Sequence, residues 1–442
     1  MTTQRRVLLA IVSICLLALP VGSRATNGPI EIRVLSSRAD LISGGDALVE
    51  IVLPSSATPT VALDGNDVTS AFALRPNGKF EGLLEGLPLG ASTLTATLPD
   101  GHGARIALTN HANGGPLFSG PQIQPWVCRE KTALDSQCNQ PPQYTYFYKP
   151  TDPRKKGLHP YDPTKPPADV ASTTTDRGVT MPFIIRVERG YQDRDEYKIA
   201  TLYRPGQGWS AWAPQPQWNH KLLITHGGSC GDDFGSWSAP SVLGYNPPSD
   251  LIGPPIDLPK PSFADSVQYA LGAGFAVMST ALNNNGHNCN LVVQAESMLM
   301  AKERLIEQYG EVRYTIGTGC SGGSLTQQWV ANAYPGLYQG ILPTCSFPDT
   351  WSSATQVMDY HLLRAYLEDR SKWSSGVLWT EPQVAAVEGH VASLNAKLSD
   401  EGFFWAAEPT GRCWPLQKTQ TYNRATNPGG VRCGIADYAI NV

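Results

Sequence analysis

Residues 314–325 read Tyr314-Thr315-Ile316-Gly317-Thr318-Gly319-Cys320-Ser321-Gly322-Gly323-Ser324-Leu325, and they decide the fold of this chain. The five central residues, 319–323, match the G-x-S-x-G pattern of a nucleophile elbow. Residues 313–316 predict a short apolar strand, and residues 324–334 predict a helix with one apolar stripe. A tight glycine turn between them would lift Ser321 above the sheet, with the helix N-terminus beneath a developing oxyanion. We therefore expect Ser321 to be a catalytic nucleophile; the alternative is a glycine-rich turn that only packs.

The composition indicates a globular, loop-rich protein. The chain has 442 residues, enough for two domains, with 41% hydrophobic and 16% charged residues, 42 Gly and 36 Pro. A net charge of −4 gives no reason to expect nucleic acid or an anionic membrane as a partner. Neither a P-loop nor a dinucleotide fingerprint is present, so we expect no cofactor.

The N-terminus has the pattern of a secretory signal peptide, which we place at residues 1–25. Arg5 and Arg6 precede an apolar run over residues 7–19, and Ser23-Arg24-Ala25 offers a small-x-small cleavage site. We expect no membrane span, since this run is too short for a stable anchor and no other segment could cross. The mature chain is therefore expected to be secreted or periplasmic.

Export changes the meaning of the cysteines. Eight remain after the signal segment is removed, and an even number in an oxidising compartment predicts disulfides. Short separations favour Cys128–Cys138 and Cys413–Cys433, and two strands expected to be neighbours favour Cys230–Cys289. No CxxC or HxxxH spacing supports a metal site, so none is expected. The eight candidates are Cys128, Cys138, Cys230, Cys289, Cys320, Cys345, Cys413 and Cys433.

Two segments precede the elbow-bearing domain. Residues 27–118 alternate apolar and polar side chains between turn signals, which predicts a small β-sandwich similar to immunoglobulin-like modules. Its expected role is docking against the next domain, with substrate or surface binding as the alternative. Residues 119–181 form a Pro-rich wrapping linker, and the prolines in the wider stretch 113–180 argue against regular structure.

From residue 182 to residue 349 strands alternate with helices. Strands are predicted at 183–188 and 197–203, as a hairpin, and at 221–225, 275–280 and 338–343; helices are predicted at 263–271 and 292–309. This order predicts an α/β domain with a mostly parallel sheet and helices on both faces. Residues 350–442 predict a lid-like helical segment, with helices at 354–369 and 382–398 and many aromatic side chains.

A second motif, His226-Gly227-Gly228, follows the predicted strand at 221–225. Glycines at a strand end let the backbone approach a substrate closely. In this interpretation Gly227 or Gly228, together with Gly322, donates a backbone N–H to the oxyanion. The alternative is an ordinary turn at the end of a strand.

Together these motifs resemble the α/β-hydrolase fold superfamily over residues 182–347. Because Cys320 precedes the serine, the chain looks most similar to the secreted esterase branch that includes tannases and feruloyl esterases. The resemblance implies an acyl-enzyme mechanism and a lid inserted before the late strands. It also implies a disulfide from Cys320 to a cysteine beside the catalytic histidine, and the order serine, acid, histidine.

The sequence departs from this pattern after Ser321. The remaining histidines are His361 and His390, both in predicted helices, and Asp349 is the best local acid, ahead of Asp359, Asp369 and Glu381. We expect either one of these groups or an acid and histidine beyond residue 442 to complete the site. In the latter case Cys345 is the available partner for Cys320.

Three functions are therefore open. The first is a secreted serine carboxylic-ester hydrolase acting on a small-molecule or polymeric ester, with a peptidase or amidase as a close variant. The second is a catalytically degenerate hydrolase-fold binding protein, or a fragment that lacks its acid and histidine. The third is a carbohydrate- or surface-binding protein led by the N-terminal module.

Overall fold

The computed structural model of the chain describes residues 29–54, 57–228, 231, 233–244, 264–347, 349, 369–389 and 416–432, with a few positions between 359 and 367. The expected signal segment lies outside these residues, as do Cys230, Cys413, Cys433, His361 and His390. Within the described ranges, no helix is both long and apolar enough to cross a membrane.

The N-terminal part consists of two sheets over one hydrophobic core. One sheet has the order β1 (Glu31–Val34), β3 (Ala47–Val52), β7 (Phe80–Leu84), β6 (Phe72–Leu74). The other has the order β2 (Ile42–Ser43), β9 (Gly103–His111), β8 (Gly90–Thr97), β4 (Thr60–Leu63), β5 (Asn66–Asp67). Val49, Ile51 and Leu94 are among the side chains buried between them. The two-sheet layout agrees with the alternating sequence pattern, and the likeness to immunoglobulin modules stays a prediction.

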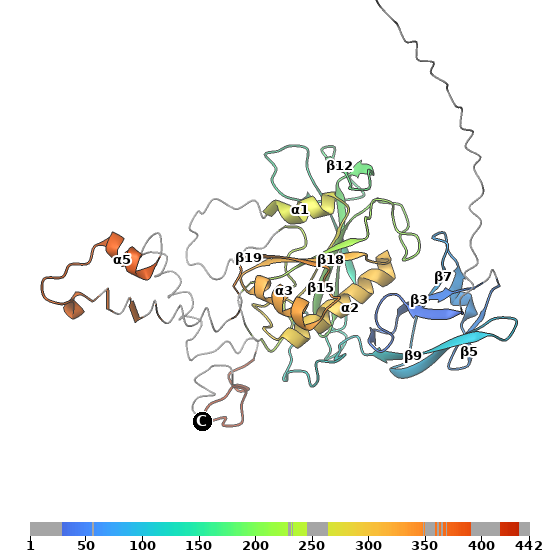
Figure 1. The fold of residues 1–442 in the computed structure, drawn as a ribbon, viewed down its shortest axis with the longest axis horizontal. Helices are drawn as coiled ribbons and strands as arrows, with labels where there is room; N and C mark the ends of the chain where they lie inside the picture. Colours follow the sequence, from blue (N-terminus) through green and yellow to red (C-terminus); the bar gives the residue numbers. More distant parts are fainter. Residues whose placement is uncertain are drawn as a thin grey trace, which may run out of the picture.

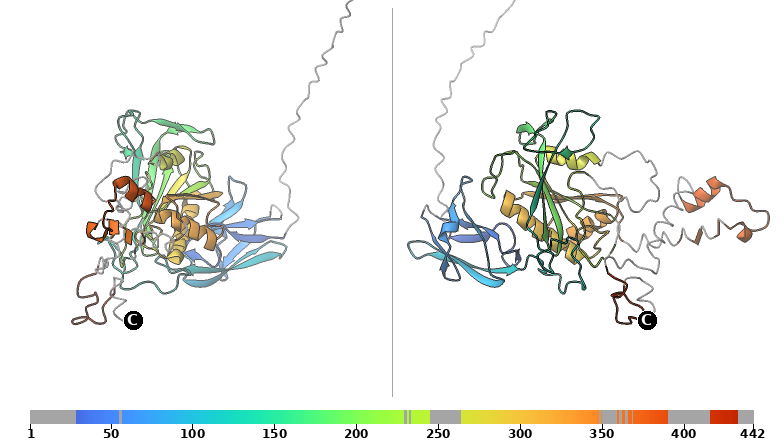
Figure 2. Two further views of the ribbon diagram at one scale, coloured as in Figure 1. Left: turned by 60° about the vertical axis from the view of Figure 1, so that its left-hand side comes forward. Right: turned by 180° about the vertical axis from the view of Figure 1, so that it is seen from behind.

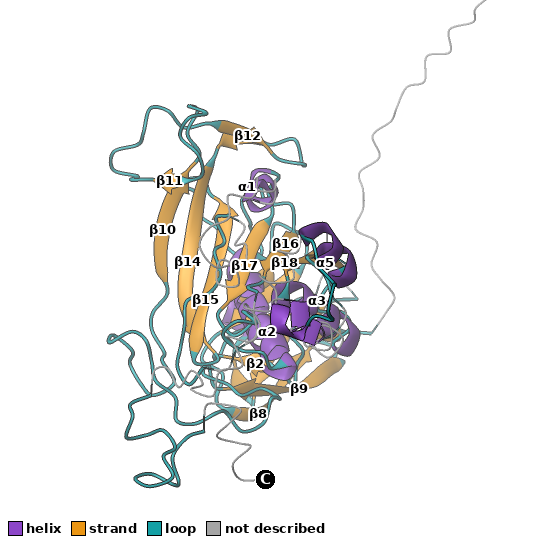
Figure 3. Cartoon of the chain, turned by 90° about the vertical axis from the view of Figure 1, so that its left-hand side faces the viewer, coloured by secondary structure: helices purple, strands orange, loops and turns teal. Residues whose placement is uncertain are grey.

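The central feature is an eight-stranded sheet. Its order is β11-β10-β14-β15-β17-β16-β18-β19. Figure 3 shows the long strands β10, β14 and β15 side by side, followed by the shorter strands. The strands are β10 (Gln143–Tyr148), β11 (His159–Pro160), β14 (Ile184–Gln192), β15 (Asp195–Leu202), β16 (Lys221–Thr225), β17 (Ala276–Thr280), β18 (Tyr314–Cys320) and β19 (Gly340–Thr344).

The sheet is mixed, so the prediction of a mostly parallel sheet is wrong for one half of it. Strands β17, β16, β18 and β19 are parallel, whereas β11, β10, β14 and β15 pair antiparallel, and β15 joins β17 antiparallel. The reason lies in the connections. Only Asp193 and Arg194 separate β14 from β15, and a turn of two residues can join strands only when they are antiparallel.

Strand β10 corrects a second expectation, because it lies inside the proline-rich stretch where no regular structure was predicted. The prolines nearest to it, Pro142 and Pro150, flank the strand and do not interrupt its ladder. Its sequence, Gln143-Tyr-Thr-Tyr-Phe-Tyr148, is aromatic and β-branched and pairs along its whole length with β14. Two further short strands, β12 (Ser172–Thr174) and β13 (Thr180–Pro182), form a separate pair.

Three helices cover the sheet (Figure 1). α1 (Ala264–Gly272) lies on one face, and α2 (Leu291–Tyr309) and α3 (Gly322–Ala333) lie on the other. α2 begins after Asn290, whose side chain accepts hydrogen bonds from the N–H groups of Val292 and Val293. Its buried face packs Met298, Leu305 and other residues against the parallel strands.

The N-terminal sheets meet the main domain at α2. Figure 2 shows the N-terminal sheets, in blue, next to the main domain in both views. The Ser43 N–H and hydroxyl both donate to the buried Glu303 carboxylate. Leu48 belongs to the same hydrophobic cluster as Ala301 and Leu305. This contact joins the two parts through apolar packing and polar contacts, among them the buried Glu303.

The C-terminal part contributes the 3₁₀ turn η2 (Arg370–Lys372) and helix α5 (Glu381–Glu388). Gly389 adopts the left-handed conformation that ends α5, whereas one helix was predicted over residues 382–398. Residues 390–398 lie outside the described residues. α5 lies apart from the main sheet in Figure 1 and in the right-hand view of Figure 2. The predicted lid over a substrate therefore stays a prediction.

Candidate active site

Ser321 lies at the turn between β18 and α3. Its backbone has φ 56° and ψ −122°, a conformation that a residue with a side chain rarely adopts. Its N–H donates to the Thr344 carbonyl of β19 at 3.2 Å, and its own carbonyl accepts from the N–H groups of Ser324 and Leu325 in the first turn of α3. The backbone is therefore held in the strained form by hydrogen bonds on both sides.

The glycines of the motif have a steric reason. A Cβ on Gly319 would lie 3.0 Å from the His226 Cβ, and a Cβ on Gly323 would lie 3.0 Å from both the His226 Cβ and the Gly227 carbonyl oxygen. The turn and the segment His226-Gly227-Gly228, which we call the HGG loop, thus pack backbone against backbone. The two sequence motifs come together as expected.

The HGG loop directly follows β16. The His226 N–H donates to the Thr318 carbonyl of β18, which anchors the loop beside the elbow. Within the described part of the chain, neither Gly227 nor Gly228 donates its N–H to another group. Gly322 is the first residue of α3, so its N–H also has no intrahelical acceptor. Among the described residues, the N–H groups of these three glycines thus have no hydrogen-bond acceptor.

His226 is a buried neutral residue and not a base for Ser321. Its Nε2 lies 2.8 Å from the Tyr338 hydroxyl. Burial disfavours the imidazolium and lowers the pKa of His226 to about 4. The side chain therefore anchors the HGG loop through its contact with Tyr338.

The disulfides support part of the cysteine scheme. Cys128 pairs with Cys138, as short separation predicted, and Cys320 pairs with Cys345. The second bridge ties the end of β18, next to Ser321, to the residue after β19. Cys289 is also disulfide-bonded; its expected partner Cys230 lies outside the described residues.

The predicted acids all lie in the segments that follow β19. Asp349 is half-buried beyond β19, Asp359 is exposed, and Asp369 accepts a hydrogen bond from the Ser371 N–H at the start of η2. Glu381 lies in the first turn of α5. His361 and His390 fall outside the described residues, and among those described no side chain hydrogen-bonds to the Ser321 hydroxyl.

A cluster that the sequence did not predict lies at the same edge of the sheet. His287 Nε2 lies 2.7 Å from Asp195 Oδ2, and its Nδ1 lies 3.1 Å from Asp233 Oδ2. Burial alone would lower the pKa of His287, but the two aspartates outweigh it and raise the pKa to about 9. These residues are far apart in sequence; an Asp-Arg-Asp triplet at the tip of a predicted hairpin was the available signal.

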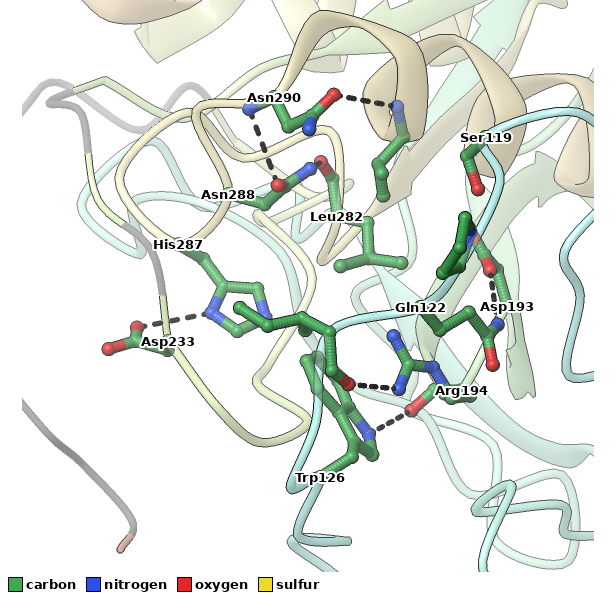
Figure 4. A pocket seen from close by; sticks show the side chains of 13 residues that line it. Ser119, Gln122, Trp126, Asp193, Arg194, Asp233, Leu282, His287, Asn288 and Asn290 are labelled. Carbon is green, nitrogen blue, oxygen red and sulfur yellow. Dashed lines mark hydrogen bonds and ion pairs between the residues drawn. The ribbon is translucent and has the colours of Figure 1, made fainter. Parts of the chain in front are cut away.

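His287 and Asp233 line a pocket of about 330 Å³ (Figure 4). Asp193 and Arg194 of the β14–β15 turn, Trp126 and the N-terminal end of α2 form its other walls. Burial raises the pKa of Asp193 well above its usual range, and the nearby Glu296 adds to this rise. Within the described ranges, no group of three His, Cys, Asp or Glu side chains is placed to hold a metal ion.

One family model matches the chain. It is described as "Tannase-like family of unknown function (DUF6351)" and covers residues 32–442. No curated protein matches the chain in sequence.

Several solved structures share weak similarity with the chain. A feruloyl esterase B from Aspergillus oryzae has 16% identity and a TM-score of 0.27, covering 68% of this chain and 51% of its own. A tannin acyl hydrolase from Aspergillus niger has 14% identity and a TM-score of 0.25, covering 45% and 34%. A thermophilic PNB esterase has 15% identity and a TM-score of 0.21, covering 48% and 38%. The chain thus spans between about a third and about half of the length of these structures.

Proposed function

Because this chain belongs to the tannase-like family, we propose that it is a carboxylic-ester hydrolase of the serine type, with Ser321 as the nucleophile. The observation that carries the proposal is the strained Ser321 backbone at a strand–helix turn, packed against the HGG loop. A serine in this position, beside free N–H groups, is what acyl transfer requires.

In the proposed reaction the Ser321 hydroxyl attacks the ester carbonyl and passes its proton to a general base. The N–H of Gly322 and one N–H from Gly227 or Gly228 stabilise the tetrahedral oxyanion. The alcohol leaves with a proton, and water then attacks the acyl-enzyme, releasing the acid and restoring Ser321. Loss of one oxyanion donor is expected to cost about 3 kcal/mol of transition-state stabilisation.

The general base must be a residue other than His226 and His287, the two buried histidines near the candidate site. His226 is neutral and lies against Tyr338, and both ring nitrogens of His287 are occupied by aspartates. His361 and His390 are the remaining candidates in the chain, with Asp349 as the local acid.

The occupied histidines also favour a second candidate function, a catalytically degenerate hydrolase-fold protein that binds an ester without cleaving it. A serine without a general base is a poor nucleophile, so such a protein would keep the pocket and lose the turnover.

Hydrolysis of p-nitrophenyl acetate, butyrate and benzoate by the wild type and Ser321→Ala separates the two functions. The hydrolase predicts turnover that disappears in Ser321→Ala. His361→Ala and His390→Ala then identify the base, because one of them is expected to lower kcat by at least about a hundredfold. Binding of benzoate ester without turnover in the wild type would instead support the degenerate form.

We also propose that the protein works outside the cytoplasm on a small-molecule or polymeric ester. Disulfides Cys128–Cys138 and Cys320–Cys345 support an oxidising compartment. Proteolytic mapping of the N-terminus of the exported protein would test the predicted cleavage after Ala25.

A further inference from the structure

His287 lies where three separate segments meet at the carboxyl ends of the parallel strands. It belongs to the loop that follows β17, Asp195 begins β15, and Asp233 follows the HGG loop. The register between Tyr197 and Thr280 places the start of β15 at this edge of the sheet. All three side chains of the cluster are at least nine-tenths buried.

The backbone around His287 forms a ladder with the segment after the HGG loop. The Gly231 N–H donates to the Asn285 carbonyl, the Cys289 N–H to the Gly231 carbonyl, and the Asp233 N–H to the His287 carbonyl. The same loop reaches the HGG loop itself, because the Asn284 side chain occupies the space that a Cβ on Gly227 would fill. One loop therefore contacts the HGG loop at Gly227 and hydrogen-bonds to Gly231 and Asp233, which follow the HGG loop.

The ionic contacts fix this loop to the rest of the sheet. Asp195 Oδ1 accepts from the Trp237 N–H at 2.8 Å while its Oδ2 holds the His287 ring, so a single carboxylate binds both segments. The ring centroids of Trp126 and Trp237 lie 6.3 and 5.2 Å from that of the imidazole. Losing one member of a buried ion pair leaves the other charge uncompensated, which makes such a cluster a strong local anchor.

From this geometry we propose that His287 is a positioning residue, which with Asp195 and Asp233 holds the HGG loop in the place where it can donate to an oxyanion. The inference rests on the proposed function for its catalytic meaning, although the holding of the loop is a property of the folded chain alone.

The charges that face His287 set how the anchor responds to pH. Asp195 contacts the ring from the start of β15, and Asp233 contacts it from the segment after the HGG loop. Asp193 and Arg194 of the β14–β15 turn line the same pocket, whereas the described pocket residues at 119–126, in its own loop and at the start of α2 add no other titratable side chain. The pKa of His287 is raised to about 9, so the ionic contacts are complete below its unfolded pKa near 6.5 and are lost as pH rises through about 9.

The test is hydrogen–deuterium exchange of the intact chain, followed on peptides covering residues 226–236. His287→Asn is compared with the wild type and with His220→Asn, a matched change at the opposite end of β16. His220 has a positive φ that Asn tolerates, and its Nδ1 contacts only the Glu311 carbonyl. Asp233→Asn is a second variant, since it keeps an acceptor near His287 and removes the charge.

We expect His287→Asn to speed exchange in residues 226–236 by at least about tenfold, with strands β14 and β18 unchanged, and Asp233→Asn to give a smaller effect of the same kind. His220→Asn should leave these peptides unchanged. In the wild type, exchange in them, corrected for the intrinsic rate, should rise between pH 8 and pH 10, and this rise should be absent in His287→Asn.

Unchanged exchange in both His287→Asn and Asp233→Asn would overturn the proposal, as would equal acceleration over the whole domain. Fluorophosphonate labelling of the same proteins separates this failure from failure of the proposed function. A wild type that takes no label but shows the predicted exchange pattern refutes the esterase and keeps the anchor. A labelled wild type with unchanged exchange in the variants keeps the esterase and refutes the anchor.

Discussion

Gly227 and Gly323 face each other so closely that a Cβ on Gly323 would lie 3.0 Å from the Gly227 carbonyl oxygen. One glycine belongs to the HGG loop and the other to the first turn of α3. Their contact packs the HGG loop against the first turn of the helix that follows Ser321. The geometry of the candidate site thus depends on two backbones that tolerate no side chain between them.

Gly323→Ala is the most direct perturbation of this contact. The new Cβ meets backbone and Cβ atoms that have little room to move, and such overpacking costs about 1–3 kcal/mol. Alanine recovers up to about 1 kcal/mol through its higher helix propensity. We expect a net loss of roughly 1 kcal/mol in the free energy of unfolding, measured by urea denaturation. Fluorophosphonate labelling of Ser321 should also become slower. Gly208→Ala, where no atom lies within 4 Å, is the control and should change neither.

Tyr338→Phe tests how much the contact between Tyr338 and His226 stabilises the fold. The change removes the hydroxyl that lies 2.8 Å from Nε2 of a fully buried imidazole. A buried polar atom that loses its partner costs about 1–3 kcal/mol, so the midpoint of urea unfolding should fall accordingly. Tyr269→Phe, at a side chain that is 78% exposed, should be neutral. Equal midpoints for the two variants would show that the His226–Tyr338 contact adds nothing.

The contact between the N-terminal sheets and α2 should depend on pH. Burial raises the pKa of Glu303 to about 8, although hydrogen bonds from Ser43 act in the opposite direction. A carboxyl whose folded pKa is raised contributes stability below its unfolded value, near 4.5, and loses it as pH rises toward 8. We expect the free energy of unfolding to fall by roughly 4 kcal/mol between pH 5 and pH 8.5, because a tenfold change in a protonation equilibrium corresponds to about 1.4 kcal/mol.

Glu303→Gln is the variant that identifies the group responsible. The amide stays neutral at every pH, so most of this slope should disappear in urea denaturation between pH 5 and pH 8.5. Burial also raises the pKa of two nearby acids, Glu307 and Asp46, and they account for any slope that remains. A slope in Glu303→Gln as steep as in the wild type would contradict the assignment.

The Cys320–Cys345 bridge closes a stretch of 25 residues that contains the elbow and α3. Loop-closure entropy predicts a loss of about 3 kcal/mol in the free energy of unfolding when both cysteines become serine. Because the bridge lies next to Ser321, labelling of Ser321 should also slow. The double change Cys128→Ser with Cys138→Ser removes a bridge across only 10 residues, and it should leave the labelling rate unchanged. Equal labelling rates for both double variants would contradict a role for the 320–345 bridge in shaping the elbow.

Local sequence predicted the elements around the elbow well. The glycine spacing at residues 319–323 predicted the turn, and the apolar patterns predicted β16, β17, β18, α2 and α3 to within a few residues. These elements are short-range: each is decided by its own periodicity and caps, as with Asn290 at the start of α2. The contact between the elbow and the HGG loop also followed, since both motifs end neighbouring parallel strands.

Long-range features were missed for a physical reason. The Asp195–His287–Asp233 cluster depends on which loops meet at one sheet edge, and nothing local to Gly286-His287-Asn288 indicates its partners. β10 was missed because prolines break a strand only when they lie within it, whereas Pro142 and Pro150 lie just outside β10. The Cys320 partner was left open between a cysteine beside a histidine and Cys345, and only the neighbouring position of β19 decides it.

The most direct test of the central claim is fluorophosphonate labelling of the exported chain, with the modified residue located by peptide mapping. We expect one adduct per chain, on Ser321, absent in Ser321→Ala and retained in Gly208→Ala. A folded wild-type protein that takes no adduct, or takes it at another residue, would contradict the assignment of Ser321 as an activated nucleophile.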